Sequence, residues 1–278
     1  MRRLLIFTDL DGSLLDSVTH SYEPARATLD LLRTLAVPVV FVSSKTRAEI
    51  EHLRQAMEST APFVVENGGA VFVPEGYFGR PPRGALANAG YHVVEFGTPY
   101  ADLRAALGRI AEASGVELRG FGDMTPEELG ERTGLSRHAA VLAQQRAYDE
   151  PFLVCGPASV ESRIRRTIDA CALQWTRAGR FHHLTGQNDK GKAIALLTQW
   201  YRERWSRMGQ GTEVVTVGIG DSLSDRSMLE QVDYPILVQR PDGSYDQDVR
   251  APRLTYANGS GPVGWSLSVM DVLRTRMS

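Results

Sequence analysis

The sequence contains little cysteine, no excess of charge of one sign and no long hydrophobic run. Among its 278 residues the two cysteines, Cys155 and Cys171, are too few for a disulfide framework or a cysteine-rich zinc site. Lys and Arg number 31 against 33 Asp and Glu, so the chain lacks the basic excess with which nucleic-acid-binding proteins neutralise phosphates. No stretch approaches the roughly 18 apolar residues of a transmembrane helix. We therefore expect a cytoplasmic protein without a nucleic-acid or membrane partner, and the oligomeric state stays open.

The overall composition is that of a globular protein. Hydrophobic residues make up 42% of the chain and charged residues 23%, values that exclude collagen-like and wholly disordered chains. At roughly 150 residues per domain, the length favours two domains.

The first part of the chain alternates between short apolar runs and helical patterns. The predicted order is strand 4–8, a helix from Pro24, strand 37–42, a helix from Thr46, strand 63–65 and a hairpin partner at 70–73. Strands that alternate with helices imply a parallel sheet covered on both faces. We therefore predict the α/β class, with a doubly wound, Rossmann-like core.

This rhythm is interrupted in the middle of the chain. Six of the eleven residues in 74–84 are Gly or Pro, a density that neither a helix nor an inner strand tolerates. Beyond it the pattern is that of an open α+β segment, and the α/β rhythm resumes after Gly186. The predicted division is a core of residues 1–84 and 186–278, with residues 85–185 inserted as a cap domain that moves as a lid.

Two aspartates follow the first predicted strand. Asp9 and Asp11 flank Leu10, and side chains alternate along an extended chain, so both carboxylates are expected on one side. The carboxyl ends of strands are the usual ligand site of an open α/β sheet. Two like charges so close together raise the pKa of one carboxyl group. One group then stays ionised, as nucleophile or metal ligand, and the other carries a proton, unless a cation neutralises both. Taken alone, the pair fits equally well as turn-forming residues that end a strand.

A second acidic cluster follows the apolar run 214–217. Asp221 and Asp225 belong to the string GIGDSLSD (218–225), whose glycines let a ligand approach the backbone. With Asp9 and Asp11 they predict four carboxylates at one rim of the sheet, a concentration of charge that calls for a hard divalent cation such as Mg²⁺. Asp225 by itself fits equally well as an acid in the first turn of the next helix.

Four motifs thus occur in order along the chain: DLDGS (9–13), Ser43 after the second strand, Lys190 at the start of a late helix, and Gly220-Asp221 with Asp225. Together they resemble the motifs of haloacid dehalogenase-like phosphatases. The insert after the third strand is similar to the C2-type cap of the Cof-like branch. Further strings resemble mannosyl-3-phosphoglycerate phosphatases in particular: SSKT (43–46), ENGG (66–69), RAYDEPF (146–152) and DKGK (189–192).

The resemblance implies hydrolysis through an aspartyl-phosphate intermediate. Asp9 would attack phosphorus, and Asp11 would protonate the leaving alkoxide and then take a proton from water. Asp9, the backbone carbonyl of Asp11 and Asp221 would hold magnesium. Ser43 and Lys190 would complete the catalytic set by holding the other phosphoryl oxygens.

The same resemblance suggests further substrate-binding residues. Ser44, Lys45 and Asn67 lie in the matching strings. Many Cof-like members carry Asn where this chain has Ser224, so a phosphate contact made by that amide would here be absent or made by a hydroxyl. Ser224 is therefore included as a candidate.

The string 146–152 combines residues suited to a substrate that carries a sugar and a carboxylate beside its phosphate. Arg146 offers a planar fork for the carboxylate, while Asp149 and Glu150 offer acceptors for sugar hydroxyls. A solvated helix end, in which Arg and Glu pair with each other, fits the same pattern.

These observations predict a magnesium-dependent phosphatase whose partner is a small sugar-phosphate substrate. The specific expectation is hydrolysis of mannosyl-3-phosphoglycerate to mannosylglycerate and phosphate. A phosphatase or phosphomutase for another sugar phosphate is the alternative within the same fold. A non-enzymatic phospho-ligand sensor is the third hypothesis, and the presence of both Asp9 and Asp11 argues against it. The missing hydroxyl at Ala193, which follows GQNDKGK (186–192), argues against a phosphate loop, since that loop needs Ser or Thr there to ligate magnesium.

Overall fold

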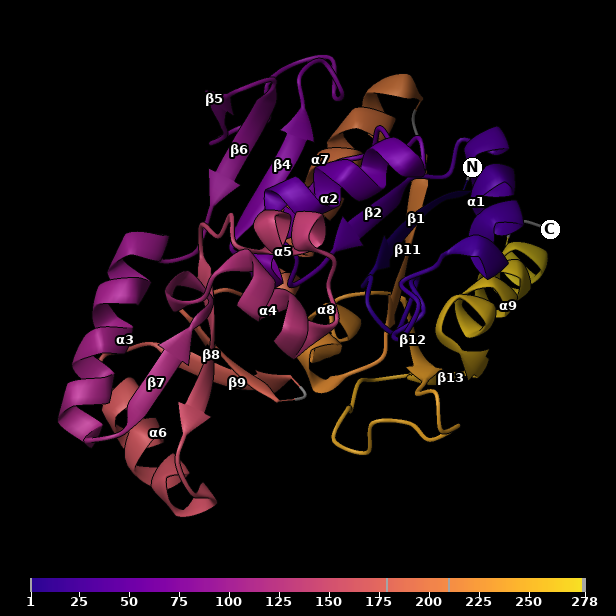
Figure 1. Ribbon diagram of the computed structural model, residues 1–278. Coiled ribbons are helices and arrows are strands. Elements are labelled where there is room, and N and C mark those ends of the chain that lie inside the picture. Colours follow the sequence, from indigo (N-terminus) through magenta and orange to yellow (C-terminus); the bar gives the residue numbers. More distant parts are fainter. Residues whose placement is uncertain (1, 179, 210, 277–278) are drawn as a thin grey trace.

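A nine-stranded mixed sheet forms the centre of the computed structural model, which describes residues 2–178, 180–209 and 211–276 (Figure 1). The strand order is β13-β12-β11-β1-β2-β3-β4-β6-β5. Neighbours from β13 to β3 are parallel, and those from β3 to β5 are antiparallel. The bounds are β1 Arg2–Thr8, β2 Val39–Val42, β3 Phe63–Val65, β4 Ala70–Pro74, β5 Leu86–Asn88, β6 Tyr91–Glu95, β11 Glu213–Gly220, β12 Tyr234–Gln239 and β13 Thr255–Ser260.

Helices cover both faces of this sheet because the central strand is apolar on both. Leu4 and Ile6 of β1 pack in one buried cluster with residues of α1, α2 and α9, whereas Leu5 and Phe7 pack in a second cluster with residues of α7 and α8. This arrangement confirms the predicted doubly wound α/β core. The bounds are α1 Arg26–Thr34, α2 Arg47–Ala56, α7 Lys190–Met208, α8 Arg226–Leu229 and α9 Gly261–Arg276.

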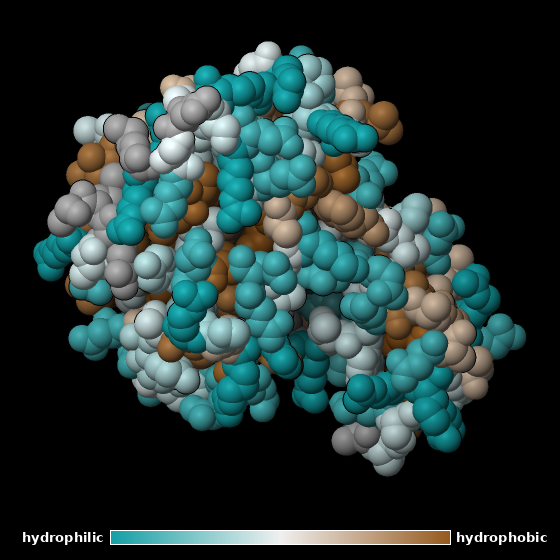
Figure 2. All heavy atoms as spheres, turned by 180° about the vertical axis from the view of Figure 1, so that it is seen from behind, coloured by the Kyte–Doolittle hydropathy of each residue, from teal (hydrophilic) through white to brown (hydrophobic). Residues whose placement is uncertain are grey.

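A second, smaller sheet has the antiparallel order β7-β8-β10-β9. Helices α3 and α6 bury one of its faces, and α4 and α5 form a further apolar cluster with Leu153 and Phe181. Seen from behind, a hollow separates the lobe of this sheet from the larger lobe (Figure 2). The bounds are β7 Glu117–Gly120, β8 Asp149–Cys155, β9 Gln174–Ala178, β10 Phe181–Thr185, α3 Tyr100–Ser114, α4 Pro126–Thr133, α5 Arg137–Ala143 and α6 Glu161–Ala170.

The first limit of the insert differs from the prediction. Residues 86–95, assigned above to the cap, form β5 and β6, and β6 pairs with β4 in the large sheet. The Gly/Pro-rich segment before them is a loop of this sheet, in which Gly76, Gly79 and Gly84 have positive φ. The chain therefore leaves the large sheet after Glu95 and not at residue 84. On the other side, α7 returns to the core at Lys190, near the predicted limit. No helix among the described residues is long and apolar enough to cross a membrane.

Candidate active site

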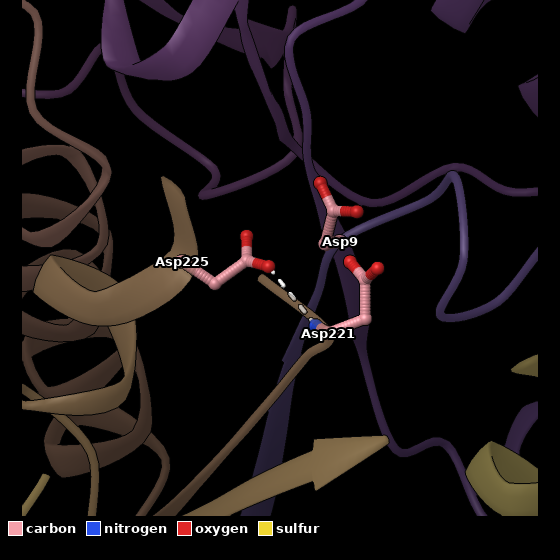
Figure 3. Close-up of side chains that lie close together, drawn as sticks. All are labelled: Asp9, Asp221 and Asp225. Atoms are coloured by element: carbon pink, nitrogen blue, oxygen red, sulfur yellow. Dashed lines mark hydrogen bonds between the residues drawn. The ribbon is translucent and has the colours of Figure 1, made fainter. Parts of the chain in front are cut away.

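The ends of two adjacent parallel strands bring the first acidic residues together. Thr8 of β1 is in register with Ile219 of β11, and the Asp9 N–H donates to the Ile219 carbonyl at 2.8 Å. Asp9 and Asp221 therefore follow neighbouring strands at the same edge of the sheet. Asp225 joins them from the short 3₁₀ helix η5, Leu223–Asp225. One carboxylate oxygen from each of the three aspartates lies within 4.8 Å of the others (Figure 3).

Lys190 supplies a cation to this cluster from the first turn of α7. The Asp189 carboxylate caps that helix by accepting from the N–H groups of Gly191 and Lys192. The Lys190 ammonium, 1% exposed, donates to Asp9 Oδ1 at 2.8 Å and to Asp225 Oδ1 at 2.7 Å. Burial alone would lower the pKa of Lys190, but the two carboxylates outweigh it and raise this pKa above its usual value.

One lysine does not balance three carboxylates. Burial, and then repulsion by Asp225, raise the pKa of Asp9 to about 7 and that of Asp221 to about 8. Gly12 lets the loop after β1 approach Asp221: its φ is 82°, and a Cβ there would lie 2.5 Å from Asp221 Oδ2. The cluster thus combines hard oxygen donors, excess negative charge and close backbone approach, which fits a divalent cation.

Asp225 differs from the other two aspartates in its hydrogen bonds. Its Oδ1 accepts from Lys190, and its Oδ2 accepts from the backbone N–H groups of Asp221 and Ser222 at 3.0 and 3.2 Å. Both oxygens therefore already have donors. The arrangement agrees with the interpretation of Asp225 as an acid in the first turn of a short helix. That Asp225 also ligates a metal stays a prediction.

Asp11 does not belong to the three aspartates whose oxygens lie within 4.8 Å of one another, but its charge still raises the pKa of Asp9 and that of Asp221. Its carboxylate pairs with the Lys45 ammonium at 2.8 Å and with His20 Nδ1 at 3.5 Å. Burial would raise the pKa of Asp11, but Lys45 and His20 together hold it well below its usual value. The hydrogen bond to Asp11 in turn raises the pKa of His20.

The segment 43–46 lies at the same edge of the sheet, because β2 is the neighbour of β1, and its Lys45 contacts Asp11. Ser43 follows β2, is 1% exposed, and accepts at its Oγ from the Lys45 N–H at 3.2 Å. Thr46 caps α2 in a capping box with Glu49. The structure thus places Ser43 and Lys45 at the edge of the site that Asp9 and Asp11 occupy.

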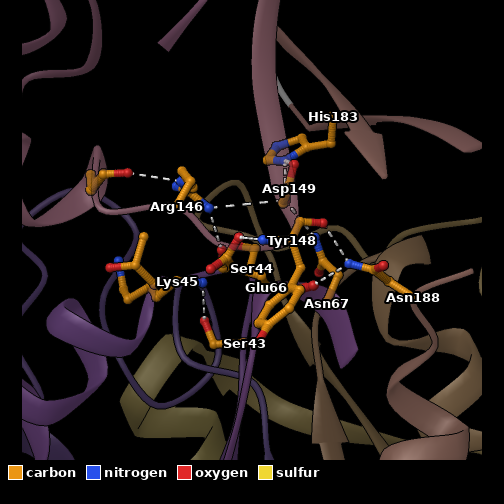
Figure 4. A network of polar contacts seen from close by, with 12 residues as sticks. Ser43, Ser44, Lys45, Glu66, Asn67, Arg146, Tyr148, Asp149, His183 and Asn188 are labelled. Carbon is orange, nitrogen blue, oxygen red and sulfur yellow. Dashed lines mark hydrogen bonds and ion pairs between the residues drawn. The ribbon is translucent and has the colours of Figure 1, made fainter. Parts of the chain in front are cut away.

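The segment before β8 docks on the core through a set of buried polar contacts, here called the joint, which comprises Glu66, Asn67, Arg146, Tyr148, Asp149, His183 and Asn188 (Figure 4). The Glu66 carboxylate accepts from the N–H of Ala147 at 3.0 Å and from that of Tyr148 at 2.7 Å. The Asn188 amide donates to the carbonyls of Glu66 and Tyr148, both at 2.9 Å. Burial raises the pKa of Glu66 to about 7.

The predicted residues of the string 146–152 already have partners within the protein. Arg146 donates to the carbonyl of Ser44 at 2.8 Å, so Ser44 meets this segment through its backbone. Asp149 is fully buried and contacts His183 Nδ1 at 2.8 Å. Glu150, also fully buried, pairs with Arg104 at 3.0 Å. Asp149 is thus enclosed by its own partners, whereas Glu150 Oε2 is buried without a hydrogen-bond partner in the described part of the chain. The sugar contacts of both residues stay predictions.

The remaining candidates lie nearer to open space. Asn67, in a left-handed turn with φ 59°, donates to Asp149 Oδ2 at 3.3 Å. Ser224 is exposed, and its hydroxyl shares a hydrogen bond with Ser222 at 3.0 Å. Both residues line one cleft with Lys190.

The sequence interpretation missed Glu66 and Asn188 as residues of the joint. Its strings included Glu66, but nothing local indicated that this carboxylate accepts hydrogen bonds from residues 81 and 82 positions later. His20 was missed as well, since it contacts Asp11 only because the intervening loop folds back.

No protein-family model matches this chain. It is similar to a protein from Methanococcoides burtonii named glucosyl-3-phosphoglycerate/mannosyl-3-phosphoglycerate phosphatase, with 43% identity over 97% of each chain. A protein of the same name from Persephonella marina is 34% identical, again over 97% of each chain. A mannosyl-3-phosphoglycerate phosphatase from Pyrococcus horikoshii is 32% identical over 84% of this chain and 90% of that one.

Solved structures resemble the whole fold at low sequence identity. A sugar phosphatase of haloacid dehalogenase subclass IIB aligns with a TM-score of 0.63 and 16% identity, covering 97% of this chain and 98% of that one. A protein from Thermoplasma acidophilum aligns with a TM-score of 0.65 and 15% identity, covering 99% and 98%. At such identities the likeness concerns the fold: a core sheet with a smaller sheet inserted.

Proposed function

The chain belongs to the family of glucosyl-3-phosphoglycerate/mannosyl-3-phosphoglycerate phosphatases, and we propose that it hydrolyses the phosphate monoester of a glycosylated 3-phosphoglycerate. The products are the glycosylglycerate and inorganic phosphate. The observation that carries the proposal is the cluster of Asp9, Asp221 and Asp225 around Lys190 at the strand ends of this fold. Both mannosyl and glucosyl substrates are proposed, because the relatives from M. burtonii and P. marina are named for both.

Asp9 is the proposed nucleophile. One of its oxygens is held by Lys190, so the carboxylate has a fixed orientation as it attacks phosphorus and displaces the substrate's alkoxide. The phosphoryl group then resides on Asp9 until water attacks and releases phosphate. Ser43 and Lys190 are the residues proposed to hold the other phosphoryl oxygens, which would orient the group for attack.

Asp9, Asp221 and the backbone carbonyl of Asp11 are the proposed magnesium ligands. When bound, magnesium offsets the repulsion between these carboxylates and an anionic phosphate. Asp225 keeps Lys190 and the backbone N–H of Asp221 in position through its hydrogen bonds.

Asp11 is the proposed proton carrier, and its surroundings suggest how it gains a proton. In the free protein Lys45 and His20 keep it ionised. An arriving phosphate adds negative charge and competes for the Lys45 ammonium, and both changes raise the pKa of Asp11. Asp11 then donates a proton to the leaving alkoxide and recovers one from the attacking water.

The smaller sheet and its helices, roughly residues 96–189, are proposed to act as the cap. Closure over the strand ends would exclude water from the reacting phosphate. The joint supports this role, since hydrogen bonds from Ala147, Tyr148 and Arg146 to the core hold the two parts together.

A phosphate-release assay tests the proposed function. Mannosyl- and glucosyl-3-phosphoglycerate are compared with 3-phosphoglycerate, mannose 1-phosphate and mannose 6-phosphate, with magnesium or with a chelator. We expect the highest kcat/KM for the glycosylated phosphoglycerates and loss of turnover in chelator. A preference for the free hexose phosphates would contradict the proposal and favour another sugar phosphatase.

A further inference from the structure

The loop between β12 and β13, residues 240–254, follows the strand next to the one that leads to Asp221 (Figure 1). Gly220, at the end of β11, is in register with Leu237 of the parallel strand β12. The segments that follow these two strands therefore begin at the same edge of the sheet, where ligands of such folds bind. The proposed mechanism uses no residue of this loop.

A tight turn and a tyrosine fix the first half of the loop. The Arg240 N–H donates to the Ser244 carbonyl at 2.8 Å, which closes the turn. The Tyr245 hydroxyl donates to the Ala257 carbonyl in β13 at 2.6 Å and accepts from the Gln239 amide in β12 at 3.1 Å. The loop is thus tied to both strands between which it runs.

Asp246 connects this loop to the segment that carries Asp221. Its side chain is buried, and its Oδ2 accepts from the Leu223 N–H at 3.1 Å. The same oxygen pairs with the Arg240 guanidinium at 2.9 Å, and Oδ1 accepts from the Asp248 N–H at 3.0 Å. Both carboxylate oxygens are therefore held, which fixes the orientation of the side chain toward Leu223.

Three successive backbone N–H groups after β11 donate to carboxylates. Those of Asp221 and Ser222 donate to Asp225 Oδ2, and that of Leu223 donates to Asp246. Because Asp225 lies in the same short segment as these donors, its bonds to them set the shape of the segment. Asp246 instead ties the segment to a separate, anchored loop.

We propose that Asp246 is a positioning residue for the magnesium site. The inference rests on the proposed function, in which Asp221 is a metal ligand. Asp246 acts through the backbone of Leu223, two residues after Asp221, and so limits where the Asp221 carboxylate lies relative to Asp9. Like charges repel, so without a cation these two carboxylates are driven apart. A fixed segment opposes this separation and keeps the two carboxylates close together for the ion.

The ion pair with Arg240 does not explain the position of Asp246 by itself. The Arg240 side chain is 45% exposed, and an exposed ion pair contributes little to stability. A role limited to the fold would lower the free energy of unfolding and leave the affinity for magnesium unchanged. A positioning role would change that affinity in the folded protein, which separates the two.

Asp246→Ala removes the acceptor of the Leu223 N–H and leaves the proposed ligands in place. Asp248→Ala is the matched control, because it removes the same charge from the same loop at an exposed position. Isothermal titration calorimetry measures the Kd for Mg²⁺ in the absence of substrate. Groups that orient metal ligands contribute about 10- to 100-fold in affinity, and since Asp246 acts through the backbone we expect a rise in Kd of about 10-fold. The control should stay within about 2-fold of wild type.

Turnover gives a second readout. The magnesium concentration for half-maximal rate should rise by the same factor, whereas kcat at saturating magnesium should stay close to that of wild type. If circular dichroism shows that Asp246→Ala is unfolded, Asp246→Asn takes its place. This variant keeps one acceptor oxygen, so a smaller rise in Kd of about 3-fold is expected.

An unchanged Kd in the folded variant would overturn the proposal, even if kcat were lower, because Asp246 would then serve the fold alone. An equal rise in Asp248→Ala would overturn it as well, since lost negative charge would explain the effect. If wild type binds no magnesium, the proposal fails. If wild type binds magnesium but does not hydrolyse a glycosylated 3-phosphoglycerate, the proposed function fails, and the comparison of Kd values still decides the role of Asp246.

Discussion

Two buried acidic regions lie close together in this protein, and they balance their charge differently. In the catalytic cluster, Lys190 pairs with Asp9 and Asp225, while Asp221 adds a third carboxylate beside them. In the joint, each carboxylate is enclosed by donors: Asp149 by His183 and Asn67, and Glu66 by two backbone N–H groups. Negative charge that the protein leaves unbalanced marks a place for a cation and an anionic substrate, whereas satisfied acceptors mark a contact that holds two parts together.

The same contrast occurs within one loop. Asp9 and Asp11 are two residues apart, yet burial and Asp225 raise the pKa of Asp9 to about 7, while Lys45 and His20 lower that of Asp11. The free protein thus favours a protonated Asp9 and an ionised Asp11, so the proposed roles require a bound cation, which favours the ionised form of Asp9, and a bound phosphate, which raises the pKa of Asp11. Substitutions in the cluster should therefore affect chemistry, and substitutions in the joint should affect stability.

The largest effect is expected from Asp9→Asn. An amide is neither the required nucleophile nor an anionic ligand, so phosphate release should fall to the background of the assay. Circular dichroism and thermal unfolding of the variant establish that it is folded. Turnover near the wild-type rate would show that Asp9 is not the nucleophile.

Asp11→Asn should lower kcat by about 10² to 10⁴, the usual contribution of a positioned acid or base, while KM changes little. The change leaves Asp9, Lys190 and Asp221 in place, so it separates proton transfer from nucleophilic attack. Steady-state kinetics on mannosyl-3-phosphoglycerate measure it. An unchanged kcat, with chemistry shown to limit the rate by a pre-steady-state burst experiment, would contradict the role of Asp11.

Glu66→Gln tests the joint. In the variant an NH₂ group replaces one of the carboxylate oxygens that accept hydrogen bonds from the backbone N–H groups of Ala147 and Tyr148. Because one of these N–H groups then loses its acceptor, we expect the free energy of unfolding to fall by about 1 to 3 kcal/mol. The activity of the folded fraction should be kept. Glu75→Gln, at an exposed position, should stay within about 0.5 kcal/mol of wild type. A stable Glu66→Gln variant with a collapsed kcat would place Glu66 in the chemistry instead.

A smaller, graded effect is expected from pH in the absence of divalent cations. The folded protein holds protons on Asp9 and Asp221 up to about pH 7 and 8, whereas unfolded carboxyls lose them near pH 4. The native state therefore binds more protons in this window, and its stability falls as pH rises through it. Magnesium should oppose the fall most strongly at the alkaline end.

Denaturant unfolding in chelator, at several pH values between about 5 and 8, measures this slope. Glu66, whose pKa burial raises to about 7, contributes a slope of the same sign. Asp221→Asn isolates the cluster and should have a shallower profile than wild type. Stability in chelator that rises with pH would contradict the charge imbalance inferred for the cluster.

The parts of the site that sequence could predict are those that follow from local rules. A short apolar strand that ends in Asp9, and another that ends in Asp221, must place these residues at one edge of a parallel sheet. Lys190 was assigned from a motif, and the capped start of α7 brings it to the same edge. The doubly wound core followed from the alternation of strands and helices.

The parts that sequence could not predict depend on contacts between distant segments. Local propensity does not show that Glu66 meets Tyr148, 82 residues later, or that Asp149 is enclosed by His183. The Gly/Pro density of 74–84 indicated a break in regular structure, but a break inside a sheet and a break between domains have the same composition. The partners of Asp11, Lys45 and His20, could not be predicted either, because both contacts depend on how loops fold back.

The covalent state of Asp9 during turnover tests the proposed mechanism most directly. Wild-type protein is mixed with mannosyl-3-phosphoglycerate and magnesium, quenched in acid within the first turnovers, digested and analysed by mass spectrometry. We predict a phosphoryl group on the peptide that contains Asp9, at the Asp9 side chain, and its absence when a chelator replaces magnesium. Sustained turnover with no phosphoryl group on the protein, or with one on a residue other than Asp9, would contradict it.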